Sequence, residues 1–378
     1  MREAGKLRRV GIVAEYNPFH AGHAYHIAAA RRRAGECAVV CAMSGNFVQR
    51  GECAITDKWS RARAALEGGA DLVLELPTVW AASSAERFAF GAVSILRAAG
   101  AEILSFGSES GDGEALQRAA AALDSERFRA ALRGHLDEGL PFALCRQRAA
   151  EELLGKEGAA CLSRPNDNLG VEYLRAAARL GWTPGVVAIP RVGAGHDGGD
   201  HEAYPSASFV RGEMLAGRLP ADNPASLRFA ERAVLARLRS MALSDFEALP
   251  DSGEGLAGRL YDAVRRAVSL EELYDLAKTK RYAHARIRRL VLWAALGLRE
   301  SDRPEHPPYL RVLGFNERGR EVLREIKERA ALPVITKPTH GKGDPLLELE
   351  ARCTDLYALC REKAGPCGAE WSTSPIIV

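Results

Sequence analysis

The 378-residue chain lacks an apolar run long enough to span a bilayer, and its first nine residues lack the apolar core of a signal peptide. We therefore expect a cytoplasmic protein without a membrane partner. The chain also has little excess charge, with a net charge of +3. A nucleic-acid partner would therefore need locally concentrated cations rather than a uniformly basic surface. We find no internal repeat and no low-complexity tract.

The eight cysteines include no Cys-x-x-Cys pair, and we interpret them as reduced thiols rather than a disulfide framework. Cys353, Cys360 and Cys367 recur every seven residues, a spacing that raises the question of a metal site. However, Gly365-Pro366 interrupts the helix before the third thiol, and no nearby histidine completes a zinc set. We therefore expect no metal-ligating residues, and any role for these three cysteines stays open.

Apolar residues make up 47% of the chain, which is enough to build cores for two or three domains. Over about the first 215 residues, short apolar runs alternate with helical patterns. This alternation predicts an α/β fold with a mostly parallel, Rossmann-like sheet. We expect strands at 10–14, 38–43, 71–76, 102–106 and 186–189, and helices at 24–33, 58–66 and 86–98 (the last opened by a capping box from Ser83 to Glu86).

After about residue 220 the strand signal fades and helical patterns dominate, at 225–243, 254–269 and 282–298. A short mixed tail follows a proline-rich break at 303–308. We place the domain boundary at Leu219-Pro220. The prediction is an α/β domain at 1–219 followed by a mainly α-helical C-terminal domain at 220–378.

Two histidines stand between a strand and a helix near the start of the chain. The strand ends at the turn Asn17-Pro18, and His20 and His23 follow directly before a helical run. Unpaired backbone N–H groups and the positive end of the helix dipole attract an anion there. Gly22 lets the backbone approach the guest, and the imidazoles can donate to a phosphoryl oxygen as charge develops on it. This segment predicts a site where a phosphate is bound and attacked.

Further polar loops follow the expected strands, at the sheet edge where ligands of parallel sheets bind. The loop 44–52 carries Arg50, and Lys58 at the next helix start could reach a phosphate. Solvated surface charge is the alternative for both cations. Asp71 is expected to cap, and Glu75 to be buried and paired. His26 is left open between supporting the site and lying on the helix surface.

A basic segment lies far along the chain. Residues 278–299 hold seven Lys or Arg and no acidic residue. A helical wheel places the apolar side chains of Ile287, Leu290, Val291 and Ala294 opposite an arc of cations. A solvated surface is one interpretation of this arc, but Tyr282 and His284 beside it favour a nucleic-acid backbone as partner. The cations on the arc are Lys278, Arg281, Arg286, Arg288 and Arg289.

Taken in order, these motifs resemble the bacterial tRNA(Met) cytidine acetate ligase family of the HIGH-motif nucleotidyltransferase superfamily. His20-Ala-Gly-His23 is similar to the HIGH motif, and Ser206-Ala-Ser-Phe-Val-Arg211 to the second, Ser/Thr-rich motif. The resemblance extends over nearly the whole chain. It rests on the strings Glu-Tyr-Asn-Pro-Phe-His-x-Gly-His, Ser-Gly-Asn-Phe-Val-Gln-Arg-Gly-Glu, Gly-Ala-Asp-Leu-Val-Leu-Glu-Leu-Pro, Phe-Gly-Ser-Glu, Arg-Tyr-Ala-His-Ala-Arg-Ile-Arg-Arg and Leu-Arg-Val-Leu-Gly-Phe-Asn-Glu-Arg-Gly.

The resemblance implies a two-step ligase. ATP and acetate give acetyl-adenylate, and the acetyl group then passes to the wobble cytidine of elongator tRNA(Met) to form N(4)-acetylcytidine. Mg²⁺ is implied with ATP, and the catalytic residues would be His20 and His23. The implied ATP site comprises Val13, Ala14, Glu15, Tyr16, Asn17, Pro18, Phe19, His20, Ala21, Gly22, His23, Ala24, Tyr25, His26, Gly107, Asn166, Arg191 and Val192.

Three side chains of the second motif, Ser206, Ser208 and Arg211, are expected to assist in nucleotide binding, and the basic arc is expected to hold tRNA. Two alternatives compete with the ligase. One is a nucleotidyltransferase that adenylates a phosphorylated cofactor precursor, and the other is a non-catalytic RNA-binding protein on the same fold. The sequence leaves open the oligomeric state, the reading of the anticodon, the basis of acetate selectivity and the general base for acetyl transfer.

Overall fold

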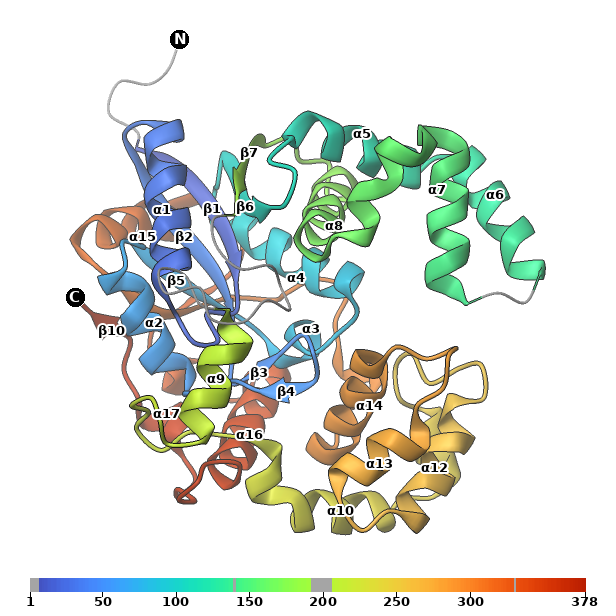
Figure 1. Ribbon diagram of the computed structural model, residues 1–378. Coiled ribbons are helices and arrows are strands. Elements are labelled where there is room, and N and C mark those ends of the chain that lie inside the picture. Colours follow the sequence, from blue (N-terminus) through green and yellow to red (C-terminus); the bar gives the residue numbers. More distant parts are fainter. Residues whose placement is uncertain (1–6, 139–140, 192–205, 330) are drawn as a thin grey trace.

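The computed structural model describes residues 7–138, 141–191, 206–329 and 331–378. Its centre is a mostly parallel sheet of order β10-β8-β5-β2-β1-β6-β7, with β9 paired to β8 and helices on both faces (Figure 1). This arrangement confirms the expected α/β class. The strands are β1 (Arg8–Ala14), β2 (Cys37–Ser44), β5 (Leu72–Leu76), β6 (Ile103–Ser108), β7 (Gly185–Pro190), β8 (Leu310–Phe315), β9 (Val334–Ile335) and β10 (Ile376–Ile377), beside an antiparallel pair of β3 (Phe47–Val48) and β4 (Glu52–Cys53).

Helices in the first 215 residues cover the sheet or extend from it (Figure 1). They include α1 (Ala21–Ala34), α2 (Lys58–Glu67), α3 (Thr78–Ala81), α4 (Ala85–Ala98), α5 (Gly113–Leu123), α6 (Glu126–Asp137), α7 (Phe142–Ala159), α8 (Pro165–Arg179) and α9 (Ala207–Leu215). The expected capping box from Ser83 to Glu86 is wrong. Helix α4 begins at Ala85 with Ser84, not Ser83, as its N-cap, and the Ser83 hydroxyl donates instead to the carbonyl oxygen of Val79.

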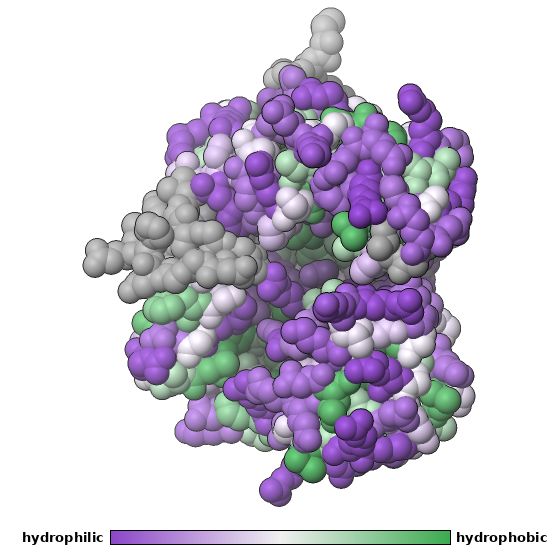
Figure 2. Space-filling view, turned by 45° about the vertical axis from the view of Figure 1, so that its right-hand side comes forward, coloured by the Kyte–Doolittle hydropathy of each residue, from purple (hydrophilic) through white to green (hydrophobic). Residues whose placement is uncertain are grey.

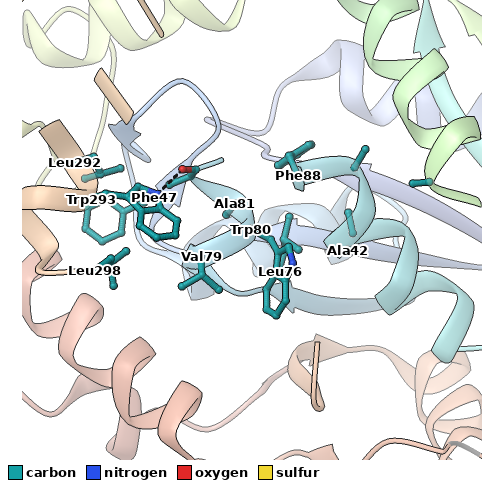
Figure 3. Packing of buried hydrophobic residues seen from close by; sticks show 14 of the residues in the cluster. Ala42, Phe47, Leu76, Val79, Trp80, Ala81, Phe88, Leu292, Trp293 and Leu298 are labelled. Carbon is teal, nitrogen blue, oxygen red and sulfur yellow. Dashed lines mark hydrogen bonds between the residues drawn. The ribbon is translucent and has the colours of Figure 1, made fainter. Parts of the chain in front are cut away.

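A group of short helices follows, and Figure 1 shows it beside the sheet-bearing part. It contains α10 (Glu231–Arg239), α11 (Leu243–Glu247), α12 (Leu256–Arg266), α13 (Leu270–Ala277) and α14 (His284–Leu296). We call these elements the helical unit. Helix α14 packs on the sheet-bearing part through Trp293, which lies with Phe47 and Val79 in Figure 3 and whose Nε1 donates to the carbonyl oxygen of Ala82 at 2.6 Å.

The last part of the chain differs from the expected helical domain at 220–378. After the helical unit, β8 pairs antiparallel with β5 and β10 pairs parallel with β8. Helices α15 (Glu317–Arg329), α16 (Pro345–Leu359) and α17 (Ala369–Ser372) belong to this returning segment. Residues from 310 onward therefore complete the sheet of the first domain, and the helical unit lies between two parts of one α/β domain.

Buried charges join the returning segment to the sheet. The Lys58 ammonium of α2 lies 2.6 Å from Glu75 of β5 and 2.5 Å from Glu370 of α17. The guanidinium of Arg311 on β8 lies 3.5 Å from the same Glu370. Each of these side chains is at most 1% exposed. Because an unpaired charge is costly in the interior, these groups require β8 and α17 to pack against β5 and α2.

Candidate functional site

A cavity of about 440 Å³ opens beside the carboxyl ends of β1, β6 and β7. Its walls come from the β1–α1 turn, the hairpin of β3 and β4, the starts of α4, α8 and α9, and the ends of β6 and β7. Parallel strands direct their carboxyl ends to one edge of a sheet, so loops that are far apart in the sequence meet there.

The β1–α1 turn fixes the two motif histidines as a pair. His20 is the N-cap of α1, and its Nδ1 accepts the backbone N–H of Gly22 at 3.1 Å. The Nδ1 of His23 accepts the backbone N–H of His20 at 3.2 Å, so the two side chains form a reciprocal cap. A Cβ on Gly22 would lie 2.9 Å from Cε1 of His20. A side chain at this position would therefore push the His20 ring out of its capping position.

Aromatic packing holds the pair from behind. The ring of Tyr16 meets that of His23 edge-on, with 4.9 Å between centroids, and also meets Phe19 at 5.0 Å. Tyr16 has φ +48°, a left-handed conformation that costs free energy in a non-glycine residue and is typical of functional turns. Helix α1 thus begins at Ala21, three residues earlier than the sequence predicts, because His20 itself caps it.

Burial keeps the histidines neutral. Desolvation, with the nearby charge of Arg191, lowers the pKa of His20 to about 4. Desolvation followed by the charges of His20, His26 and Arg191 lowers the pKa of His23 well below its usual range. A neutral imidazole carries one proton, and the Nδ1 of both His20 and His23 accepts a backbone N–H. Their protons are therefore assigned to Nε2, which is free to donate to a guest.

His26 supports the site from one turn along α1. Its Nε2 lies 3.0 Å from the Ser105 hydroxyl on β6, and desolvation lowers its pKa to about 4. His26 therefore ties the helix to the sheet and also lines the cavity. Of the two interpretations, the structure supports the first, and His26 is not a surface residue.

The second motif packs directly against the first. Ser206 caps α9 by accepting the backbone N–H of Phe209 at 3.2 Å. Arg211 donates to the carbonyl oxygen of Asn17 at 2.8 Å and to the Ser208 hydroxyl at 3.1 Å. A helix N-terminus and a guanidinium thereby join the two histidines at one cavity, an arrangement that suits a polyphosphate.

A polar cluster beside the cavity joins β6, α8 and β7. Asn166 donates from Nδ2 to Glu109 at 2.6 Å and accepts from Arg191 at 3.1 Å. Its neighbour Asp167 is buried and accepts the backbone N–H of Glu109 at 2.9 Å. Asn166 therefore lines the cavity, whereas Asp167 fixes the loop behind it.

Most of the expected ATP-site residues meet at this cavity. Pro18, Phe19, Ala21 and Ala24 belong to the same turn and helix but do not line it, and Val192 lies outside the described residues. Sequence reasoning missed Phe88 on α4 and Tyr173 on α8, as well as Asn168, which stands two residues after the expected Asn166. The expected residues that line the cavity are Val13, Ala14, Glu15, Tyr16, Asn17, His20, Gly22, His23, Tyr25, His26, Gly107, Asn166, Arg191, Ser206, Ser208 and Arg211.

The structure agrees with the sequence predictions for some of the four charged loop and strand residues and not for others. Lys58 cannot reach a phosphate in the cavity, because it is fully buried between Glu75 and Glu370. Glu75 is buried and paired, as predicted. The Asp71 carboxylate accepts the backbone N–H of Val39 at 2.7 Å and pairs with Arg31, so it ties β2 to α1 rather than capping a helix. Arg50 lines the cavity.

The basic arc divides into two groups. Helix α14 begins at His284, so Lys278 and Arg281 lie in the exposed loop before it and not on its face. Arg286, Arg288 and Arg289 are only partly exposed and bind within the protein. Their partners are Glu254 for Arg286 at 2.8 Å, Glu52 for Arg288, and the carbonyl oxygen of Gln49 for Arg289 at 3.4 Å. The apolar side of the helix is buried as predicted.

Within the described part of the chain, no three His, Cys, Asp or Glu side chains gather to hold a metal ion. Cys353 and Cys360 are buried free thiols and Cys367 is an exposed one. In the same part of the chain, no helix is both long and apolar enough to cross a membrane.

Comparisons with known proteins agree over nearly the whole chain. A family model described as HIGH Nucleotidyl Transferase matches residues 7–368. A tRNA(Met) cytidine acetate ligase of Clostridium perfringens (strain SM101 / Type A) is 34% identical over 403 aligned residues, covering 97% of this chain and 98% of the relative. One of Thermoanaerobacter sp. (strain X514) is 35% identical and covers 96% and 98%.

Two solved structures share the fold. The chain is similar to Thermotoga maritima TmcAL in its apo form with a TM-score of 0.93, at 32% identity and with coverage of 98% of this chain and 100% of the other. It is also similar to TmcAL bound with alpha-thio ATP, with a TM-score of 0.91, 33% identity and coverage of 98% and 99%.

Proposed function

Because this chain belongs to the HIGH nucleotidyl transferase family and, within it, to the tRNA(Met) cytidine acetate ligases, we propose that it is an ATP-dependent acetate–tRNA ligase. The product is N(4)-acetylcytidine at the wobble position of elongator tRNA(Met), formed in the cytoplasm. The observation that carries this proposal is the stacked pair of His20 and His23, which shares one cavity with Arg211.

The first step joins acetate to AMP. A carboxylate oxygen of acetate attacks the α-phosphorus of ATP, and the bond from that phosphorus to the bridging oxygen of pyrophosphate breaks in line. Negative charge grows on the phosphoryl oxygens and on the departing pyrophosphate. The Nε2–H groups of His20 and His23 donate to these oxygens, and Arg211 neutralises the polyphosphate. The protein acts by position and charge, and no covalent intermediate with it is needed.

The second step transfers the acetyl group. The exocyclic amine of cytidine attacks the acetyl carbonyl, AMP leaves, and the amine loses one proton. Asn166, Arg191 and Gly107 line the cavity beside the ends of β6 and β7, which suits the adenosine. Mg²⁺ would enter with ATP. Because the described residues offer no cluster of metal ligands, phosphate oxygens and water would supply most of its coordination.

RNA would approach from the side that carries the helical unit. Figure 2 shows a hollow between the upper and lower parts of the molecule, with mainly hydrophilic residues around it. Lys278, Lys280 and Arg281 are exposed in the loop just before α14, whose later residues contact the hairpin at the cavity. These three cations suit the phosphates of a bound tRNA.

One assay separates the ligase from its alternatives. Purified protein is incubated with ATP, labelled acetate, Mg²⁺ and total tRNA, and pyrophosphate release and label in tRNA are measured. The ligase requires acetate-dependent release of pyrophosphate, with label entering tRNA. Release that ignores acetate and tRNA would support adenylation of a phosphorylated precursor instead. An absence of turnover together with tRNA binding would support a non-catalytic RNA-binding protein.

A further inference from the structure

The turn of the β3–β4 hairpin is held between the catalytic strand and the helical unit. The backbone N–H of Gln49 donates to the Glu15 carboxylate at the end of β1, at 2.8 Å. Its carbonyl oxygen accepts from Arg289 of α14 at 3.4 Å. Residues far apart in the sequence therefore bind the two backbone groups of Gln49, and the position of the turn depends on α14.

Gly51 of the turn and Glu52 of β4 also contact α14. Gly51 has φ +76°, and a Cβ there would lie 2.4 Å from the backbone nitrogen of Arg289, so the hairpin meets the helix backbone directly. Glu52 forms an ion pair with Arg288, and the two side chains are 31% and 28% exposed. The Arg288 guanidinium lies 5.1 Å from the ring centroid of Tyr274, so packing and charge both fix it.

The hairpin brings Gln49, Arg50 and Glu52 to a wall of the cavity. Burial lowers the pKa of Arg211, the Glu15 carboxylate opposes this effect, and the charge of Arg50 lowers the pKa further. The hairpin thus brings a second guanidinium, that of Arg50, to the cavity that Arg211 also lines.

The same wall has an apolar portion. Phe88 and Tyr173 line the cavity together with the hairpin. Burial raises the pKa of Tyr173, and the nearby Glu15 carboxylate raises it further. The Arg50 guanidinium can bind the carboxylate of acetate, and the aromatic rings can pack against its methyl group.

We propose that the hairpin turn, with Arg50, forms the acetate subsite, and that Arg288 is its positioning residue, acting through Glu52. The proposal rests on the proposed function. In this proposal Arg288 serves the first step of the reaction and does not bind RNA. Helix α14 would then link the RNA-binding side of the molecule to the subsite for the acid.

The test measures acetate-dependent exchange of labelled pyrophosphate into ATP in the absence of tRNA. We expect Arg288→Met to raise the KM for acetate at least tenfold, with little change in the KM for ATP or the Kd for tRNA. Glu52→Gln should have the same effect, and the double variant should be no worse than either single one, because both break one contact. The charge-swapped pair Glu52→Arg with Arg288→Glu should restore part of the acetate affinity.

Arg228→Met is the matched control, because it breaks an exposed ion pair with Glu271 of α13 that does not involve the hairpin. It should leave the KM for acetate in the exchange unchanged. The proposal is overturned if Arg288→Met and Glu52→Gln, both folded by thermal melting, keep the wild-type KM for acetate. If Arg288→Met does not fold, Glu52→Gln alone decides. A wild-type protein without acetate-dependent exchange would instead refute the proposed function.

Discussion

The imidazole rings of His20 and His23 are stacked, with 3.8 Å between their centroids and 27° between their planes. Each ring accepts a backbone N–H through Nδ1, so the first turn of α1 uses both side chains as its cap. The cap and the reactive site are therefore the same structure. Two neutral rings can stack this closely without repulsion, and their low pKa values keep them neutral at physiological pH.

Replacing His23 by alanine should remove a donor that strengthens as charge develops on the phosphate. We expect adenylate formation to fall by about 10² to 10³, equivalent to about 3–4 kcal/mol, which is typical for the loss of one such donor. Acetate-dependent pyrophosphate exchange measures this loss. The affinity for tRNA should stay near the wild-type value, and His23→Gln, which keeps an amide donor, should lose less. Normal exchange with weakened tRNA binding would contradict the placement of His23.

The histidines also predict a dependence of stability on pH. His26 titrates near 6.5 when unfolded but near 4 when folded, because burial disfavours its charged form. Between pH 4 and pH 6.5 the unfolded chain binds more protons than the folded protein. The contribution of His26 to the free energy of unfolding is therefore present above pH 6.5 and is lost as the pH falls toward 4. The largest contribution of one such residue is about 3 kcal/mol. Chemical unfolding at pH 7 and pH 5 should show a smaller difference for His26→Gln than for the wild type. Equal differences would contradict the buried neutral state.

The first half of the fold could be predicted because its signals are local. Apolar runs such as that of β2 are bounded by turns and helix starts, and burial of every residue of β2 agrees with the pattern. The histidine site could be predicted for the same reason, since strand, turn, glycine and helix follow one another within about fifteen residues.

The return of the chain to the sheet could not be predicted in this way. Strand β8 contains Arg311, a charge that argues against a central strand, and its burial depends on Glu370 nearly sixty residues later. The helical wheel for α14 failed for a related reason. It correctly separated Ile287 from the cations, but it could not show that the β3–β4 hairpin lies against Arg288 and Arg289.

Lys58 should matter for stability rather than for phosphate binding. Lys58→Met would leave Glu75 and Glu370 facing each other in the interior without their ammonium partner. Loss of one partner from a buried ion pair typically costs about 3–5 kcal/mol, and urea unfolding should show a decrease of that size. The KM for ATP of the remaining folded enzyme should be unchanged at low temperature. A raised KM for ATP with unchanged stability would return Lys58 to the nucleotide site.

Gly51 offers a separate test of the contact between the hairpin and α14. An alanine there would have to adopt φ +76° and would place its Cβ against the backbone of Arg289. Backbone strain of this kind costs about 1–3 kcal/mol, so the melting temperature should fall. Gly35→Ala is the control for positive φ alone, because Gly35 has φ +78° and no atom within 4 Å of its Cβ position. Equal losses in the two variants would mean that the contact with α14 adds nothing.

The exposed cations before α14 should govern RNA affinity through counterion release. Lys278, Lys280 and Arg281 are exposed, and each contact with a phosphate contributes about 0.7–0.9 to the slope of log K against log salt. The triple alanine variant should therefore bind tRNA more weakly and with a shallower slope, by up to about 2–3 if all three contact phosphates. Filter binding across a range of salt concentrations measures both quantities. Because the three side chains are exposed, the substitutions should leave the fold and the pyrophosphate exchange intact. An unchanged slope would show that the loop is only a solvated surface, and the RNA would then have to bind elsewhere on the helical unit.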